Sequence, residues 1–141
     1  MSICFYNEDV NYVLVFKRKI SAWLLLVIEE EQKKLGSISY IFCSDDYLLQ
    51  MNKQYLNADY FTDVITFDYT EELLISGDIF ISVDRVKENA KTYGQKYFQE
   101  MIRVILHGVL HLCGYKDKTE QEIKQMRGKE DYYLQKFDLS D

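Results

Sequence analysis

The chain contains no proline, two histidines and three cysteines among its 141 residues. The absence of proline excludes cis-proline turns and polyproline linkers. The cysteines (Cys4, Cys43 and Cys113) lie far apart and form no Cys-x-x-Cys pair. This pattern is typical of buried thiols in a reducing compartment rather than of a disulfide framework. We therefore expect a cytoplasmic protein.

An excess of positive charge is also missing. Seventeen Lys and Arg residues stand against 23 Asp and Glu residues, which gives a net charge of -6. Non-specific binding to nucleic acid depends on cations that neutralise phosphates, so this balance argues against a protein held on nucleic acid by bulk positive charge. It does not exclude a local basic cleft.

The sequence has no hydrophobic run long enough to cross a bilayer. The apolar residues 20–28 follow three basic residues and so imitate a secretion signal, but they lie too far into the chain. They also lack a small-residue cleavage site and run directly into Glu29, Glu30 and Glu31. We expect no association with membranes.

Composition and pattern indicate one globular domain. Hydrophobic residues make up 48% of the chain and charged residues 28%, which excludes intrinsic disorder. No repeat, low-complexity run or linker divides the sequence. We therefore expect a single domain over residues 1–141.

Hydrophobic periodicity predicts helices over residues 16–35, 45–57, 84–93, 98–113 and 119–137, and strands over residues 2–6, 37–43, 64–67 and 79–83. Gly36 is expected to end the first helix and Asp84 to cap the third, while Thr119 and Glu122 form a capping box for the last. Because strands alternate with helices, the sequence predicts an α+β (mixed α/β) fold. It has a small mixed sheet of about four strands and helices packed on its faces.

The two histidines, His107 and His111, lie four residues apart in the most apolar predicted helix. That spacing places both imidazoles on one helix face, within reach of a single metal ion. Two core histidines hydrogen-bonded to backbone or carboxylates are the alternative interpretation. Gly114 can turn the chain back after the helix and so return the carboxylate of Asp117 to the ion. Two histidines and a carboxylate leave a fourth position for water, as in catalytic zinc sites.

Residues 107–115 (HGVLHLCGY) resemble the HGxLHLxGYDH motif of the YbeY-type endoribonucleases, a bacterial family that matures ribosomal RNA. Upstream, Asn52, Tyr55 and residues 62–67 (TDVITF) are similar to that family's LNxxYR and TDVLSF segments, and residues 77–82 (GDIFIS) are similar to its GDIxIS strand. The resemblance runs in order from about Asn52 to Asp117.

The resemblance implies a small α/β fold and a metal-dependent hydrolase that cleaves single-stranded RNA. It implies one zinc ion per chain held by His107, His111 and Asp117, which would act in catalysis through the metal-bound water. It further implies a role in 16S rRNA 3′-end maturation and ribosome quality control. The partners would be rRNA and the small ribosomal subunit particle, with no organic cofactor.

Two positions depart from the family pattern. The family's third ligand is a histidine where this chain has Asp117, whose negative charge lowers the net charge of the site. The family's arginine after the tyrosine of LNxxYR is Leu56 here. Its phosphate contact must be lost or supplied elsewhere. Four basic residues could supply this contact, although each could instead be an ordinary solvated surface charge. They are Lys53, Lys116, Lys118 and Arg127.

Other residues have weaker assignments. Asp63 and Asp78 are expected to orient a ligand histidine from a second coordination shell, with capping or turn chemistry as the alternative. Basic and aromatic side chains beside the site are expected to contact or stack on RNA, although aromatics near strands usually belong to the core. They are Arg85, Lys116 and Lys118, and Tyr55, Tyr60, Phe61 and Tyr69.

Two other functions compete with a nuclease. A metalloprotease also uses two histidines four residues apart on a helix, but it needs a glutamate base where this chain has Gly108. A non-catalytic ribosome-assembly factor with a structural metal is the stronger alternative. An open coordination position would favour catalysis over this role.

Overall fold

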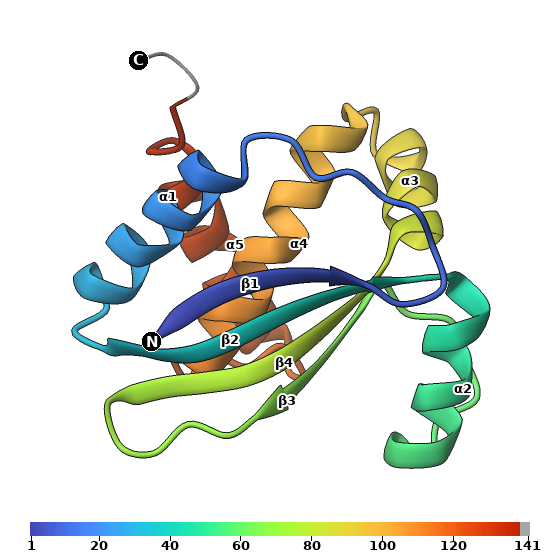
Figure 1. Ribbon diagram of the computed structural model, residues 1–141, viewed down its shortest axis with the longest axis horizontal. Helices are drawn as coiled ribbons and strands as arrows, with labels where there is room; N and C mark the ends of the chain where they lie inside the picture. The colour runs from blue at the N-terminus through green and yellow to red at the C-terminus, as the bar shows by residue number, and fades with distance from the viewer. Residues whose placement is uncertain (139–141) are drawn as a thin grey trace.

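The computed structural model describes residues 1–138, in which four strands form one mixed sheet with the order β1-β2-β4-β3 (Figure 1). β1 (Ser2–Asn7) and β4 (Leu74–Ser82) pair in parallel with β2 (Lys34–Cys43), and β3 (Val64–Asp68) pairs antiparallel with β4. The predicted α+β fold with a four-stranded mixed sheet is confirmed.

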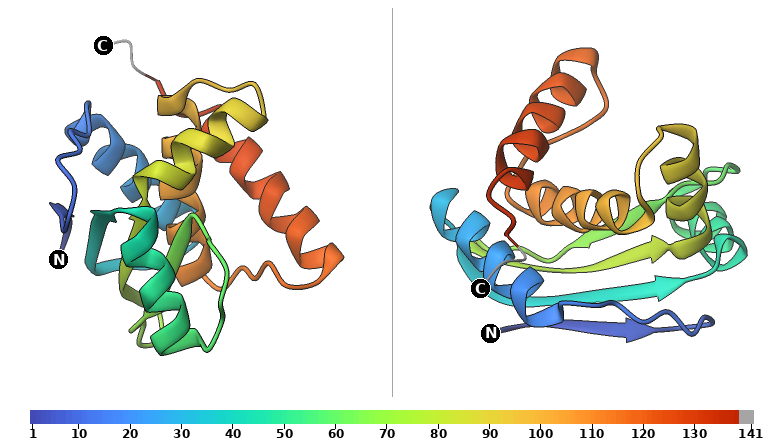
Figure 2. Two further views of the ribbon diagram at one scale, coloured as in Figure 1. Left: turned by 90° about the vertical axis from the view of Figure 1, so that its right-hand side faces the viewer. Right: turned by 90° about the horizontal axis from the view of Figure 1, so that it is seen from above.

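The helices cover the two faces of the sheet unequally (Figure 2). α4 (Tyr97–Leu112) crosses one face with α1 (Lys17–Glu30) beside it, and α5 (Glu120–Leu134) packs against α4 on the side away from the sheet. α2 (Asp45–Leu56) contacts β3 and β4 from the opposite face, and α3 (Val83–Thr92) contacts α4. α4 is therefore covered on two sides, as its apolar sequence requires.

Two glycines allow α4 to lie directly on β4. A Cβ atom at Gly108 would lie 2.8 Å from Cδ1 of Ile79, and one at Gly77 would lie 2.8 Å from Cδ2 of Leu112. Any side chain at Gly108, including a glutamate, would therefore push the helix away from the strand. The packing therefore explains why a glycine occupies position 108, where a metalloprotease would need its glutamate base.

Two predicted helix boundaries are wrong. α1 ends at Glu30 rather than continuing to residue 35, because the chain turns at Gln32 (φ 62°) and enters β2. Gly36 is not a helix cap but a strand residue, at which a Cβ would lie 2.7 Å from the carbonyl oxygen of Ile75. The cap of α3 is Ser82 rather than Asp84, because the Ser82 hydroxyl accepts from the amide of Arg85.

The capping box of α5 is confirmed. The Thr119 hydroxyl accepts from the amide of Glu122, and the Glu122 carboxylate accepts from the amide of Thr119. Within the described residues, no helix combines the length and the apolar character needed to traverse a bilayer.

Candidate functional site

The turn after α4 returns the chain to the helix, as the sequence predicts. Gly114 adopts a φ of 110°, which is strained for other residues, and the amide of Tyr115 donates to the carbonyl oxygen of Leu110 at 3.1 Å. The loop that follows carries Asp117 back to His107 before Thr119 caps the start of α5. Local chain geometry thus brings together two residues that are ten positions apart.

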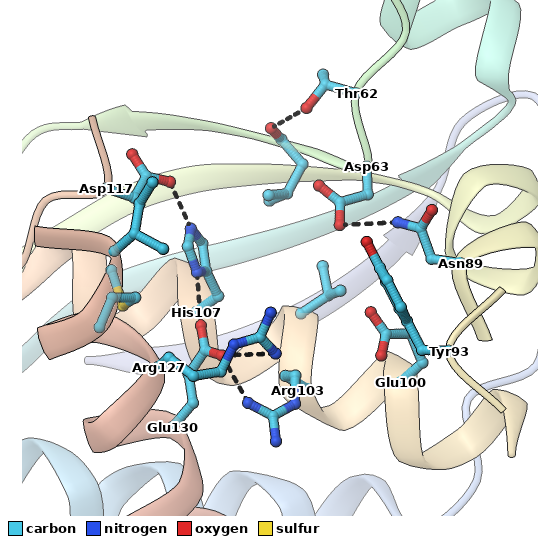
Figure 3. A pocket seen from close by; sticks show the side chains of 14 residues that line it. Thr62, Asp63, Asn89, Tyr93, Glu100, Arg103, His107, Asp117, Arg127 and Glu130 are labelled. Atoms are coloured by element: carbon cyan, nitrogen blue, oxygen red, sulfur yellow. Dashed lines mark hydrogen bonds and ion pairs between the residues drawn. The ribbon is translucent and has the colours of Figure 1, made fainter. Parts of the chain in front are cut away.

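His107 lies between two carboxylates, one at each ring nitrogen (Figure 3). Its Nε2 is 3.1 Å from Oδ2 of Asp117, and its Nδ1 is 2.7 Å from Oε2 of Glu130 on α5. Burial acts to lower the pKa of His107, but the hydrogen bond and charge of Glu130, together with Asp117 and Asp63, raise it above its usual value. The imidazole is therefore a point at which positive charge is stabilised.

His111 lies one turn further along α4 and is half-buried. It does not line the cavity into which His107 points. Across residues 1–138, no three His, Cys, Asp or Glu side chains converge to form a ready metal site. The structure thus brings two of the three expected ligands together, His107 and Asp117, and places the third on the same helix.

The cavity beside His107 has a volume of about 350 Å³ and is lined by β3, α3, α4, α5 and the segments that flank β3 and α5. Four carboxylates and two guanidiniums give its wall a formal charge of -2, which suits a divalent cation. These charged side chains are Asp63, Glu100, Asp117, Glu130, Arg103 and Arg127.

Arg103 and Glu130 form the buried side of this cavity. Nη1 of Arg103 lies 2.8 Å from Oε1 of Glu130, and its Nη2 lies 2.7 Å from Asp131. Glu130 is only 5% exposed, so its charge needs these partners. Sequence analysis did not identify Glu130. A sequence pattern could have identified it: Glu130 is an acidic residue at helical spacing from Met126 and Tyr133, on the buried face of α5.

Asp63 faces the same cavity as His107, as Figure 3 shows. Its Oδ2 accepts a 3.4 Å hydrogen bond from Nδ2 of Asn89 on α3 rather than from His107. Burial raises the pKa of Asp63, and burial likewise raises the pKa of Glu100 across the cavity. Asp63 therefore contributes to the electrostatics of the site but does not hold the ring of His107.

The expected role of Asp78 beside a ligand histidine needs correction. Side chains alternate between the two faces of a strand, and both Gly77 and Ile79 contact α4. Asp78 therefore points to the opposite face of the sheet, where its carboxylate accepts a 3.3 Å hydrogen bond from the Tyr69 hydroxyl. It lies in a separate hollow lined by α2 and cannot orient His107.

The basic residues expected to contact RNA lie outside the cavity lining. Lys116 and Lys118 are exposed on the loop around Asp117. The guanidinium of Arg85 pairs with Asp45 at 2.7 Å and stacks over the ring of Phe61. The arginine that does line the cavity with an exposed side chain is Arg127, which the sequence offered as a replacement for the missing family arginine.

The residues that resemble the family's LNxxYR segment lie outside the cavity lining and make packing or loop contacts. Asn52 is buried and donates from Nδ2 to the carbonyl oxygen of Tyr60, which fixes the loop that leads to Asp63. Tyr55 packs edge-on against Phe67, and Leu56 is exposed away from the cavity. Tyr60 and Phe61 are exposed, whereas Tyr69 lies on the same face as Asp78.

The donor set fits a zinc ion in kind, because histidine nitrogens and a carboxylate oxygen are common zinc ligands. Two ligands of a tetrahedral zinc ion, each about 2.0 to 2.2 Å from it, lie roughly 3.3 to 3.6 Å from one another. The 3.1 Å between Nε2 of His107 and Oδ2 of Asp117 is close to that separation. Metal-ligating histidines also commonly donate their other ring nitrogen to a carboxylate, which is where Glu130 lies.

Fold and site define a small α+β protein whose polar cavity is built around a histidine and acidic side chains. The family model for Endoribonuclease YbeY matches residues 4–138. The chain belongs to the Endoribonuclease YbeY family.

Individual relatives agree along nearly the whole chain. The chain is 50% identical to "Endoribonuclease YbeY" of Parabacteroides distasonis over 134 residues, which cover 95% of this chain and 94% of that protein. It is also 50% identical to "Endoribonuclease YbeY" of Cytophaga hutchinsonii, with 94% of both chains covered. The solution structure of TM1509 from Thermotoga maritima has a TM-score of 0.68 and 26% identity, and the match covers 96% of this chain and 89% of that one.

Proposed function

We propose that this chain is a zinc-dependent endoribonuclease that cleaves single-stranded RNA in the cytoplasm. The proposed substrate is ribosomal RNA on the small-subunit particle, in 16S rRNA 3′-end maturation and ribosome quality control. The observation that supports the proposal best is the His107–Asp117 pair beside a cavity with two arginines, in a chain of this family.

His107, His111 and Asp117 are the residues proposed to hold the ion. A bound zinc ion would supply Lewis acidity at a scissile phosphate and an activated water. The cavity wall contributes in two other ways. Arg127, whose side chain is 59% exposed, makes one long ion pair, 4.0 Å from Oε1 of Glu130, and can turn to bind a phosphate oxygen, while Arg103 is held more closely by Glu130 and Asp131.

The negative wall of the cavity explains why an ion would be needed for an RNA substrate. Phosphates are repelled by Asp117, Glu130 and any ionised Asp63 or Glu100. A divalent cation offsets the formal charge of -2, and RNA should therefore bind in the presence of the metal and poorly without it.

The experiment compares cleavage of one single-stranded RNA by the wild type and by His111→Ala, first with zinc and then with a chelator. We expect cleavage by the zinc-loaded wild type but not by His111→Ala or by either protein in chelator, with little action on the same sequence as a duplex and none on peptides. Lys124→Gln, on the exposed side of α5, is the matched control and should cleave as the wild type does. Equal cleavage by all proteins in chelator would indicate a contaminating nuclease and would contradict the proposal.

A non-catalytic, metal-binding assembly factor is the second candidate. It is favoured by the positions of Arg85, Lys116 and Lys118, none of which lines the cavity. Zinc binding by the wild type with no RNA cleavage in any condition would support this function over the first.

A further inference from the structure

We propose that Glu130 is the positioning residue of the site: it fixes the imidazole of His107 so that Nε2 faces Asp117. The inference rests on the proposed metal function and extends it to a residue on a separate helix. Its basis is the two short contacts of the Glu130 carboxylate, one from each oxygen, beside a longer ion pair of 4.0 Å from Oε1 to Nη1 of Arg127.

The contact with His107 is short and buried. Oε2 of Glu130 lies 2.7 Å from Nδ1, which is within the range of charge-assisted hydrogen bonds. When a metal ion displaces the proton from Nε2, an acceptor at Nδ1 keeps the remaining ring proton on Nδ1, so that Nε2 is the nitrogen that binds the ion. The same hydrogen bond sets the rotation of the ring (Figure 3).

The second carboxylate oxygen of Glu130, Oε1, is held by an ion pair with an arginine. Arg103, one turn before His107 on α4, lies 2.8 Å from Oε1, and Asp131 holds the other end of the guanidinium at 2.7 Å. The carboxylate therefore has little freedom to rotate away from the ring. Since Arg103 and His107 come from α4 and Glu130 comes from α5, packing of these two helices orients the candidate ligand.

A purely structural ion pair between α4 and α5 is the competing explanation. It predicts that zinc affinity falls only as far as the fold is destabilised, whichever acidic partner of Arg103 is lost. A positioning role predicts that only Glu130 matters for the ion, because Asp131 contacts Arg103 without touching His107.

The experiment measures zinc affinity by competition with a chelating dye for the wild type, Glu130→Gln and Asp131→Asn. Glu130→Gln keeps the size of the side chain but removes its charge, so folding, checked by chemical denaturation, should be retained. We expect zinc binding to weaken by about 10- to 100-fold in Glu130→Gln. Asp131→Asn, the matched control, should bind within about twofold of the wild type, since it alters only the exposed partner of Arg103.

A spectroscopic measurement separates orientation from general destabilisation. The chain has only two histidines, so selective ¹⁵N labelling of histidine yields signals from two imidazoles. In the zinc-loaded wild type, the Nδ1 proton of His107 should be protected from exchange and shifted downfield by Glu130. This signal should be lost in Glu130→Gln and kept in Asp131→Asn.

The outcomes are distinct. Unchanged zinc affinity and an unchanged Nδ1 proton in Glu130→Gln would overturn the positioning role while leaving the proposed function intact. Equal weakening by both variants would also overturn it, in favour of the structural ion pair. If the wild type itself binds no zinc, the proposed function is wrong and the positioning of an ion ligand is wrong with it.

Discussion

The hydroxyl of Tyr40, a fully buried residue of β2, donates a hydrogen bond to the carbonyl oxygen of Ile105 at 2.7 Å. Ile105 lies two residues before His107 in α4, so the bond joins the centre of the sheet to the helix that carries the candidate ligands. Burial raises the pKa of Tyr40 well above its usual value, which keeps the hydroxyl protonated as a donor.

Tyr40→Phe should lower the free energy of unfolding by about 1 kcal/mol, the usual net value of one hydrogen bond. The loss is small because the carbonyl of Ile105 keeps its partner within the helix. Urea denaturation of the two proteins provides the measurement. A loss above about 3 kcal/mol would show that the ring itself no longer packs and would contradict this account.

Glu31 links the end of α1 to the candidate site. Its carboxylate accepts hydrogen bonds from the hydroxyls of Tyr115 and Tyr133, and it pairs with Lys129 at 3.4 Å. Burial acts to raise the pKa of Glu31, but these hydrogen bonds and the charge of Lys129 lower it below its usual value. The stability that Glu31 contributes is therefore present above its unfolded-state pKa and lost as the pH falls through the folded-state pKa.

Glu31→Gln should accordingly lower the free energy of unfolding at neutral pH by about 2 kcal/mol, as expected for hydrogen bonds to a charged group. The difference from the wild type should narrow as the pH falls from the ordinary pKa of a glutamate through the lower pKa that Glu31 has in the folded protein. Denaturation midpoints across pH 3 to 7 test this. A difference that grows toward low pH would contradict the sign.

Asp117 is the predicted third ligand and the residue at which this chain departs from the family motif. Asp117→Ala should weaken zinc binding by more than about 100-fold, because even a residue that only supports a ligand contributes 10- to 100-fold. Asp117→His should retain binding, since histidine is an equally good zinc ligand. Zinc competition assays measure both. Unchanged affinity in Asp117→Ala would show that the 3.1 Å contact with His107 is a hydrogen bond and nothing more.

Arg127 is predicted to bind an RNA phosphate at the mouth of the cavity. Arg127→Gln should weaken binding of single-stranded RNA to the zinc-loaded protein and reduce the slope of log K against log salt by about 0.7. Lys124→Gln, three residues earlier on α5 and outside the cavity lining, is the control and should leave the slope nearly unchanged. Equal slopes for all three proteins would show that Arg127 does not contact phosphate.

The parts of the fold that the sequence predicted correctly depend on local signals. The capping box at Thr119 and the turn at Gly114 require only neighbouring residues, so both could be predicted. The local signal at Gly36 predicts a helix cap, and this prediction is wrong because the signal contains no information about distant contacts. The role of Gly36 depends on Ile75 and Ser76, almost 40 residues away on the adjacent strand, and no local pattern contains that contact.

The candidate site shows the same division. Asp117 follows His107 by one turn and a short loop, so its return to the helix could be predicted. Glu130 reaches His107 through the packing of α5 on α4, across 23 positions. The position of Asp78 next to strand residues made it a candidate to orient a ligand histidine, but the alternation of side chains along β4 turns it to the other face.

The close contact of α4 with β4 at Gly77 and Gly108 fixes the distance between helix and sheet without using any residue of the candidate site. These glycines lie at the helix–strand contact, whereas the cavity lining comes from other residues. Exposed lining residues such as Arg127 can therefore change without altering the spacing of helix and sheet. Asp117 and Leu56, the two positions at which the chain departs from the motifs it resembles, also lie away from this contact, so the scaffold does not depend on either of them.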